Sequence, residues 1–366
     1  MSKKIFIIAG ARPNFMKIAP FIYELNKQNL EYKLIHTGQH YDYLMSKVFF
    51  DELGIPEPDI HLSVGSASHA VQTAKIMIKF EKVLLNEKPT LIVVVGDVNS
   101  TLACSLVAKK LHIKIAHIEA GLRSFDQNMP EEINRILTDQ LSDFLFTTEK
   151  DATINLKREG INSNKIFFVG NIMIDNLIKN LEKAKNLKSF NKYHIKKKEY
   201  GLITIHRPSN VDNKEQLEKI FNIIDYIRTR IKIFFPIHPR TKATVKKFNL
   251  MNKMKKENLI LSEPIGYLEF LNLMKNAKLI LTDSGGIQEE ASYLKIPTLT
   301  LRKNTERPIT IEKGTNTIVD IDFEKAKTNI NKILSNTYKK GHDIEKWDGN
   351  TSQRIVTILK ERLFKN

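Results

Sequence analysis

The sequence predicts two doubly wound α/β domains in tandem, each with a parallel sheet covered by helices on both faces. Three observations predict this class. Short apolar runs alternate with amphipathic segments along the whole chain, as in parallel sheets whose strands are buried on both faces. The polar, poorly periodic stretch 183–200 divides this alternation into two similar halves. Polar motifs fall just after strands, where such sheets bind their ligands.

In the first half, apolar runs too short to be helices predict the strands 4–9, 32–37, 90–95, 114–118, 144–148 and 165–169. The amphipathic segments between them predict the helices 15–28, 41–53, 69–86, 100–111, 131–142, 150–159 and 172–186. Because Arg12-Pro13 follows the first apolar run directly, we interpret that run as a strand rather than a signal peptide. We therefore expect a cytoplasmic protein.

The second half repeats the pattern. Its predicted strands are 201–205, 231–237, 258–262, 278–282, 297–301 and 316–320. Its predicted helices are 214–229, 240–250, 266–276, 286–294, 322–336 and 350–363.

Composition narrows the class of protein further. The chain has 366 residues, of which 42% are hydrophobic, and this length favours two domains. The single cysteine, Cys104, excludes an internal disulfide and is expected to be a buried thiol. The net charge of +17 leaves nucleic-acid binding as an alternative. Because the lysines are dispersed and no aromatic residues interleave with them, we expect no nucleic-acid partner.

The motif AGARPNFMK follows the first strand. It has one glycine, so it is not the GxGxxG fingerprint of dinucleotide binding, which occurs nowhere in the chain. Arg12 and Lys17 instead flank a predicted helix start. The positive end of the helix dipole repels cations at a helix start, so two cations at this position suit an anionic ligand that binds between them. Two solvated charges in an ordinary loop are the alternative.

Acidic residues follow later strands of the first half. Asp97, in GDVNST, is either a turn residue or a functional acid. Glu119, in HIEAGLRS, lies among apolar residues, where a carboxylate is usually paired or functional, and Arg123 is its candidate partner. Glu131, in MPEEINR, begins a helix and could simply pair with Arg135 four residues later. Since all three carboxylates project from one rim, we expect them to act together.

Two histidines end successive strands in the second half, His206 in ITIHRPSN and His238 in FFPIHPR. No third ligand has suitable spacing for a metal, so phosphate contact or proton handling fits them better.

The stretch LTDSGGIQEEA, 281–291, leaves a strand through Ser-Gly-Gly and enters a helix. Residues 284–286 would present backbone N–H groups at a helix N-terminus with no side chains in the way, which suits a diphosphate. Glu289 or Glu290 can accept two hydrogen bonds from a ribose diol. Arg307, in TERP, lies near the exit of the next strand. The alternative, a glycine turn followed by acids that the helix dipole favours, explains each residue singly but not all of them together. Taken together, these residues predict a nucleoside-diphosphate site.

These motifs resemble the non-hydrolysing UDP-N-acetylglucosamine 2-epimerases. The resemblance covers nearly the whole chain through ARPNFMKIAP, GDVNST, HIEAGLRS, MPEEINR, VGNIMID, DSGGIQEE, LRKNTERP and GTN at 314–316. It implies a glycosyltransferase-B-type fold of two Rossmann-like domains, 1–186 and 187–349, with the active site between them. It also implies that the C-terminal helix, 350–366, packs back on the first domain.

The resemblance assigns roles position by position. The family's catalytic residues correspond to Asp97, Glu119, Glu131 and His206. Its substrate-binding residues correspond to Arg12, Lys17, Arg135, Ser284, Gly285, Gly286, Glu290 and Arg307. It further implies UDP-N-acetylglucosamine and UDP as ligands, no cofactor and no metal, a homodimer, and a supply of precursors for surface polysaccharide.

The expected reaction is inversion at C2 of the sugar. The hydrogen at C2 is not acidic, so inversion needs either temporary oxidation or elimination and re-addition. Since the dinucleotide fingerprint is absent, we favour elimination of UDP to 2-acetamidoglucal, followed by re-addition. Cations would stabilise the charge that develops on the departing diphosphate.

One motif departs from the family. Many bacterial members continue HRREN where this chain has HRPSN. Ser209 replaces a glutamate that in those members helps to hold a second, activating UDP-N-acetylglucosamine, so substrate activation does not follow here. The alternatives are an epimerase of a modified UDP-acetamido sugar, a hydrolysing epimerase, and a UDP-sugar glycosyltransferase of the same fold.

Overall fold

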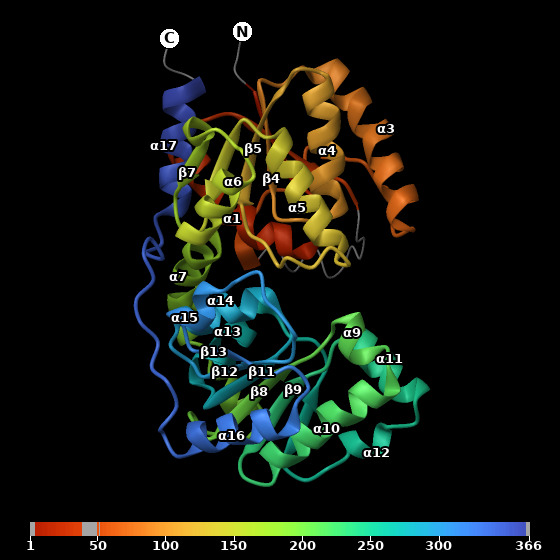
Figure 1. Ribbon diagram of the computed structural model, residues 1–366, viewed down its shortest axis with the longest axis vertical. Coiled ribbons are helices and arrows are strands. Elements are labelled where there is room, and N and C mark those ends of the chain that lie inside the picture. Colours follow the sequence, from red (N-terminus) through yellow and green to blue (C-terminus); the bar gives the residue numbers. More distant parts are fainter. Residues whose placement is uncertain (1–3, 39–49, 51, 364–366) are drawn as a thin grey trace. The chain divides into compact units, whose positions relative to one another are not determined.

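The computed structural model describes residues 4–38, 50 and 52–363. These residues divide into two compact units, Met1–Asn176 with Glu345–Asn366 and Leu177–Ile344. The boundary falls within α7 (Ile172–Lys185). Each unit contains one parallel sheet with helices on its faces (Figure 1).

The sheet of the first unit has the strand order β3-β2-β1-β4-β5-β6-β7. Its strands are β1 (Ile5–Ala9), β2 (Tyr32–His36), β3 (Ile60–His61), β4 (Leu91–Val95), β5 (Lys114–Ala120), β6 (Phe144–Thr147) and β7 (Ile166–Phe168). The central strands β1 and β4 are buried along their whole length. The strand order reverses direction between these two, and their carboxyl ends therefore form the position at which doubly wound sheets bind ligands.

Helices α3 and α4 pack against each other, and α4 also contacts α5 (Figure 1). The helices of this unit are α1 (Arg12–Lys27), α3 (His69–Glu87), α4 (Asn99–Lys110), α5 (Pro130–Leu141), α6 (Lys150–Arg158) and α17 (Thr351–Leu363), with a 3-10 turn at Ser163–Lys165. Cys104 is free and buried, as predicted.

Helix α17 belongs to the first unit although it comes last in the sequence. It packs against α1 (Figure 1), and it buries Ile355 and Leu359. The carboxylate of Asp175, on α7, caps its N-terminus by accepting hydrogen bonds from the backbone of Thr351 at 3.1 Å and of Ser352 at 2.7 Å. The cap of the helix is thus supplied by a residue far away in the chain, which satisfies N–H groups that a helix start leaves unpaired.

The sheet of the second unit has the order β10-β9-β8-β11-β12-β13. Its strands are β8 (Tyr200–Thr204), β9 (Lys232–Pro236), β10 (Leu259–Ser262), β11 (Leu279–Thr282), β12 (Thr298–Thr300) and β13 (Asn316–Ile318). The reversal of order falls between β8 and β11. The helices of this unit are α8 (Ser189–Lys192), α9 (Pro208–Val211), α10 (Lys214–Arg228), α11 (Pro239–Lys247), α12 (Met251–Met254), α13 (Tyr267–Asn276), α14 (Gly285–Tyr293), α15 (Ile309–Glu312) and α16 (Phe323–Leu334).

The predicted alternation of strands and helices is confirmed, with boundaries shifted by a few residues. The sequence pattern missed β3, whose two residues are too few for any periodicity. It also missed the four-residue helices α8, α9, α12 and α15. The helix predicted at 41–53 lies mostly outside the described residues.

Candidate active site

Asp97 follows β4 at the switch point of the first unit and forms an ion pair with Arg135. Both Nε and Nη2 of Arg135, on α5, lie close to Oδ2 of Asp97, at 3.0 and 2.9 Å. The Asp97 side chain remains 29% exposed, whereas that of Arg135 is 4% exposed. The Asp97 carboxylate therefore reaches solvent while its buried partner Arg135 holds it in place. Because an ion pair fixes its side chain, Asp97 is more than a turn residue.

Glu119 adopts a backbone conformation that is unusual for its residue type. Its φ is +71°, and the pairing of β5 with β6 shifts register between Ile118 and Ala120. A residue with a side chain in this left-handed region costs about 1–3 kcal/mol, and such strain clusters at active sites and ligand-binding positions. The shift redirects the Glu119 side chain at the end of the strand.

The partner of Glu119 is Lys17, not Arg123. Lys17 Nζ, from α1, lies 2.5 Å from Glu119 Oε2, and the two side chains are only 10% and 2% exposed. Arg123 instead pairs with Asp139 at 2.7 Å and Glu159 at 2.6 Å. The prediction failed because Lys17 and Glu119 are distant in sequence and meet only when α1 and β5 are folded.

Gly96 allows Lys17 and Glu119 to approach the backbone closely. Its φ is +67°, and a Cβ placed on it would lie 3.0 Å from Lys17 Nζ and 3.8 Å from Glu119 Oε2. A side chain at this position would therefore press on the Lys17–Glu119 pair. Since Gly96 directly precedes Asp97, the two carboxylates and the lysine surround one turn of backbone.

Glu131 is half-buried in the first turn of α5. The alternative that it pairs with Arg135 is wrong, because Arg135 Nη1 contacts Glu132 instead. Glu132 is buried and also accepts hydrogen bonds from the backbone of Ser124 at 3.0 Å and Phe125 at 2.8 Å. Glu131 forms no ion pair with any described residue, so its carboxylate is not committed to holding the fold.

One further residue at this rim, Asn14, supports the site without having been predicted. Asn14 accepts hydrogen bonds from the backbone of Gly10 and Ala11, both at 3.0 Å, and donates to the carbonyl of Val95 at 3.1 Å. It thereby ties the start of α1 to the end of β4. Arg12 is the first residue of α1, and the placement of its side chain lies outside the described part of the chain.

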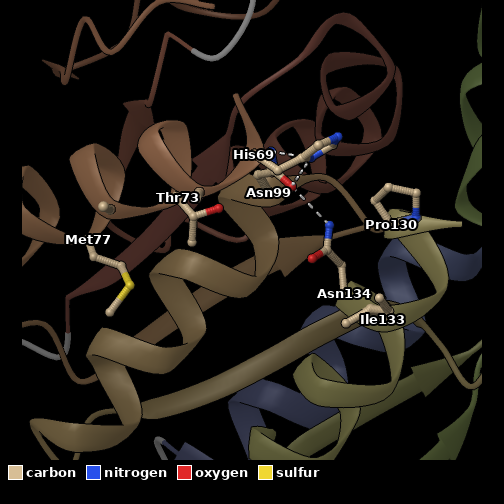
Figure 2. A pocket seen from close by; sticks show the side chains of 9 residues that line it. His69, Thr73, Met77, Asn99, Pro130, Ile133 and Asn134 are labelled. Atoms are coloured by element: carbon tan, nitrogen blue, oxygen red, sulfur yellow. Dashed lines mark hydrogen bonds between the residues drawn. The ribbon is translucent and has the colours of Figure 1, made fainter. Parts of the chain in front are cut away.

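A pocket of about 390 Å³ lies beside this rim, at the N-terminal ends of α3, α4 and α5. Figure 2 shows a chain of hydrogen bonds along one wall of the pocket. His69 Nδ1 lies 3.1 Å from Asn99 Nδ2, and Asn134 donates to Asn99 at 3.3 Å and to the carbonyl of Asp97 at 2.9 Å. The apolar part of the lining is Ala70, Ala74, Met77, Pro130 and Ile133.

In the second unit, His206 follows β8 and is oriented by Asp283, which follows β11. His206 Nδ1 lies 3.0 Å from Asp283 Oδ1, and the His206 side chain is 41% exposed whereas Asp283 is fully buried. Asp283 also accepts hydrogen bonds from the backbone of His206 and Arg207. Burial raises the pKa of Asp283, but His206 and these backbone donors outweigh it, so that the pKa is lowered. Asp283 stands in the DSGG motif, but its role was not predicted.

His238 lies beside His206, with ring centroids 5.4 Å apart. Its side chain accepts a hydrogen bond from the backbone of Arg240. Among the described residues, no three His, Cys, Asp or Glu side chains gather closely enough to hold a metal ion.

Helix α14 begins as expected of a diphosphate site. Ser284 is its N-cap, and Gly285 and Gly286 form its first turn. The first N–H groups of a helix have no partner within the helix and carry partial positive charge. A Cβ on Gly285 would lie 2.8 Å from Glu306 Oε1, so the segment that precedes Arg307 packs closely on this helix start.

The adjacent acids of α14 have different partners. Glu289 pairs with Arg307 Nε at 2.7 Å, and the side chains are 1% and 7% exposed. Glu290 accepts a hydrogen bond from the Tyr267 hydroxyl at 2.7 Å. Burial, reinforced by the charge of Glu289 and opposed by the Tyr267 hydrogen bond, raises the pKa of Glu290 to about 7. Arg307 is thus paired with Glu289, whereas the partner of Glu290 is the hydroxyl of Tyr267.

Comparisons with known proteins bear on this site. A family model described as UDP-N-acetylglucosamine 2-epimerase matches residues 23–360. The UDP-N-acetylglucosamine 2-epimerase of Methanocaldococcus jannaschii is 50% identical over 97% of this chain and 98% of its own. Its crystal structure in complex with UDP-GlcNAc and UDP superposes with a TM-score of 0.89 at 48% identity, covering 98% and 99% of the two chains. The UDP-2,3-diacetamido-2,3-dideoxy-D-glucuronate 2-epimerase of Pseudomonas aeruginosa is 40% identical over 90% of this chain and 93% of its own.

Proposed function

The chain belongs to the UDP-N-acetylglucosamine 2-epimerase family and is an isomerase of that kind, and we propose that it inverts C2 by eliminating UDP and adding it back. The family model and the relatives span nearly the whole chain, and the two parallel sheets give it the glycosyltransferase-B-type fold expected from the sequence. Its substrate is UDP-N-acetylglucosamine and its product UDP-N-acetylmannosamine.

The proposed steps balance as follows. A base removes the proton from C2 while the C1–O bond to UDP breaks, giving 2-acetamidoglucal and UDP. In the return step C2 takes a proton on the opposite face and a diphosphate oxygen of UDP bonds to C1. Two faces of C2 require two proton-handling groups or one that moves, and each such group contributes about 10²–10⁴-fold in rate.

The observation that carries this mechanism is the cluster around Gly96. Asp97 lies against the cationic Arg135, Glu119 lies against Lys17, and both carboxylates end adjacent strands. We assign Asp97, Glu119 and Glu131 to proton handling and to stabilising positive charge at C1 as UDP departs. Arg12 and Lys17 are assigned to the anionic leaving group.

We assign UDP binding to the second unit. The N-terminus of α14 at Ser284, Gly285 and Gly286 would receive the diphosphate, Glu290 the ribose, and Arg307 the diphosphate charge. His206, oriented by Asp283, is assigned to the reacting end of the diphosphate. This division of labour corresponds to an acid–base domain at 1–186 with 350–366, and a UDP-binding domain at 187–349.

Proton NMR of the protein with UDP-N-acetylglucosamine in D2O tests this function. We expect the signals of UDP-N-acetylmannosamine to appear and deuterium to replace hydrogen at C2 in both epimers. Release of free N-acetylmannosamine together with UDP would instead identify a hydrolysing epimerase. A C2 hydrogen that never exchanges, with sugar transfer to an added acceptor, would identify a glycosyltransferase.

A modified sugar is the second candidate substrate, because the Pseudomonas aeruginosa relative is named for a diacetamido sugar acid. The two candidates share C2 chemistry and differ at C3 and C6. Comparing kcat/KM for both UDP sugars with the same enzyme preparation decides between them. We further propose that the enzyme supplies precursors for surface polysaccharide and works in the cytoplasm. Among the described residues, no helix combines the length and apolarity needed to cross a bilayer.

We also propose that the enzyme is a homodimer that pairs through α3. Val71, Ile78 and Leu85 are exposed on this helix at seven-residue spacing, with Ile78 60% exposed. This spacing places them on one stripe, which suits packing against a second copy of the same helix. The substitution Ile78→Lys should yield a monomer in sedimentation experiments, while Asn86→Lys, an exposed position at the edge of the same helix face and off this stripe, should remain dimeric. A monomeric wild-type protein would contradict the proposal.

A further inference from the structure

His117 is fully buried in β5 and connects the two strand ends that carry Asp97 and Glu119. Its Nε2 lies 2.8 Å from the carbonyl oxygen of Gly96, the residue before Asp97. Its Nδ1 lies 2.7 Å from Oδ1 of Asp139, on α5. The second oxygen of Asp139 accepts a hydrogen bond from the backbone of Gly121 at 3.0 Å. His117 and Asp139 therefore hold the backbone just before Asp97 and just after Glu119.

Both ring nitrogens of His117 have partners. A carbonyl oxygen only accepts hydrogen bonds, so Nε2 carries a hydrogen and donates it to Gly96. Nδ1 lies at hydrogen-bond distance from Asp139. The ring therefore joins the end of β4 to α5 through both of its nitrogens.

Arg123 holds the other side of Asp139. Arg123 Nη2 lies 2.7 Å from Asp139 and 2.6 Å from Glu159. The Asp139 carboxylate is therefore fixed by Arg123, by the ring of His117 and by the backbone of Gly121.

We propose that His117 is a positioning residue for the reaction. Its ring clamps the Gly96 peptide to α5 and thereby sets the direction in which Asp97 leaves β4, and through Asp139 it anchors the turn that follows Glu119. The inference rests on the proposed epimerisation. Displacements of about 1 Å at reacting groups can cost about 100-fold in rate, so a clamp at the backbone of both acids affects turnover without contacting substrate.

The hydrogen bond to Gly96 is tested on the wild-type protein by NMR with ¹⁵N-labelled histidine. We expect Nε2 of His117 to carry a hydrogen that exchanges slowly with water. The resonance is assigned by through-bond correlation to the backbone, so the test does not depend on a variant that folds. An Nε2 of His117 without hydrogen would overturn the proposal.

The positioning role is tested with His117→Gln, which replaces the rigid ring between Gly96 and Asp139 with a flexible amide. We expect kcat to fall by about 10–100-fold, with KM and the affinity for UDP changed less than about twofold. The matched control is Asp143→Asn. Asp143 directly precedes β6 and accepts a hydrogen bond at 3.0 Å from the backbone of Ile115, near the start of β5. This control should retain wild-type kcat.

Two outcomes would overturn the role: a kcat for His117→Gln no lower than that of the control, or losses of kcat and UDP affinity in equal measure. Failure of the proposed function is distinguishable from either, because then the wild-type protein itself would not interconvert the two UDP sugars. The NMR result would still decide the hydrogen bond from His117 to Gly96 in that case.

Discussion

The two switch points share one strand order but present different chemistry. At the switch point of the first unit, between β1 and β4, charged side chains form ion pairs, Lys17 with Glu119 and Arg135 with Asp97. At the switch point of the second unit, between β8 and β11, the main polar groups are the N-terminus of α14 at Ser284 and the imidazole of His206, which the buried Asp283 holds.

The difference teaches how one architecture supports two tasks. Backbone N–H groups have no proton to give up near neutral pH, so they suit a ligand that must be held unchanged. Carboxylates can accept and return a proton, which a backbone N–H group cannot do. The four predictions below test this contrast, beginning with the largest expected effect.

The sharpest test replaces the acids of the first unit by amides of the same shape. Asp97→Asn, Glu119→Gln and Glu131→Gln should each lower the rate by about 10²–10⁴-fold, while UDP affinity measured by calorimetry stays near that of the wild type. A residue that serves one face of C2 should block deuterium exchange from one epimer more than from the other. Near-normal turnover in any one amide variant would show that residue to be structural.

Stability should separate these same variants. Glu119→Gln leaves the Lys17 ammonium buried without its counter-charge, and breaking a buried pair in this way costs about 3–5 kcal/mol. Glu131→Gln breaks no ion pair among the described residues and should unfold like the wild type. Equal melting temperatures for the two variants would contradict the buried pair.

The second prediction concerns Glu290, a buried acid whose partner is a tyrosine hydroxyl rather than a cation. Its pKa in the folded protein, about 7, exceeds the ordinary value of 4.5. The folded state therefore retains a proton that the unfolded chain has lost, and stability falls as the pH rises from 4.5 to 7. The shift corresponds to about 3 kcal/mol.

Urea unfolding at several pH values, for wild type and Glu290→Gln, measures this effect. The free energy of unfolding of the variant relative to the wild type should rise by about that 3 kcal/mol between pH 4.5 and 8. Glu289→Gln serves as a comparison in which the ion pair with Arg307 is lost instead. A pH-independent difference between wild type and Glu290→Gln would show that Glu290 is ionised throughout.

The third prediction separates two roles of residues in the second unit, UDP binding and turnover. Arg307→Ala should weaken UDP affinity by about 1.5–3 kcal/mol, the scale of hydrogen bonds to charged groups. His206→Ala should act mainly on turnover, since His206 is assigned to the reacting end of the diphosphate. Titration calorimetry with UDP beside steady-state rates separates the two, and equal loss of affinity would contradict the assignment.

The smallest effect is expected far from both switch points, at the cap of α17. Asp175→Ala removes the acceptor for Thr351 and Ser352 and should cost about 1–2 kcal/mol of unfolding free energy. Asp175→Asn keeps an acceptor and should cost less. Hydrogen exchange should speed up in α17 while UDP affinity is unchanged; a fall in UDP affinity would show that the cap also serves the second unit.

Much of the fold could be predicted because the strands are continuous apolar runs, such as LIVVV in β4. The sequence also located the candidate residues, because the carboxyl ends of parallel strands are recognisable positions. The partners could not be predicted. Arg135 has acids at three and four positions before it, and only the folded structure shows that it contacts Glu132 and Asp97 rather than Glu131. The sequence gives no signal for the role of His117, because Asp139 reaches it only through the packing of α5.

The long-range cap at Asp175 has a consequence for synthesis on the ribosome. Ser352 leaves the ribosome 177 residues after Asp175, and at about 5–20 residues per second this delay is roughly 10–35 seconds. During that time the whole of the second unit is translated, while the surface of α1 that α17 covers remains open to solvent and chaperones. The unit whose translation starts first is therefore the last to be completed, and nascent chains should depend on chaperones at that surface.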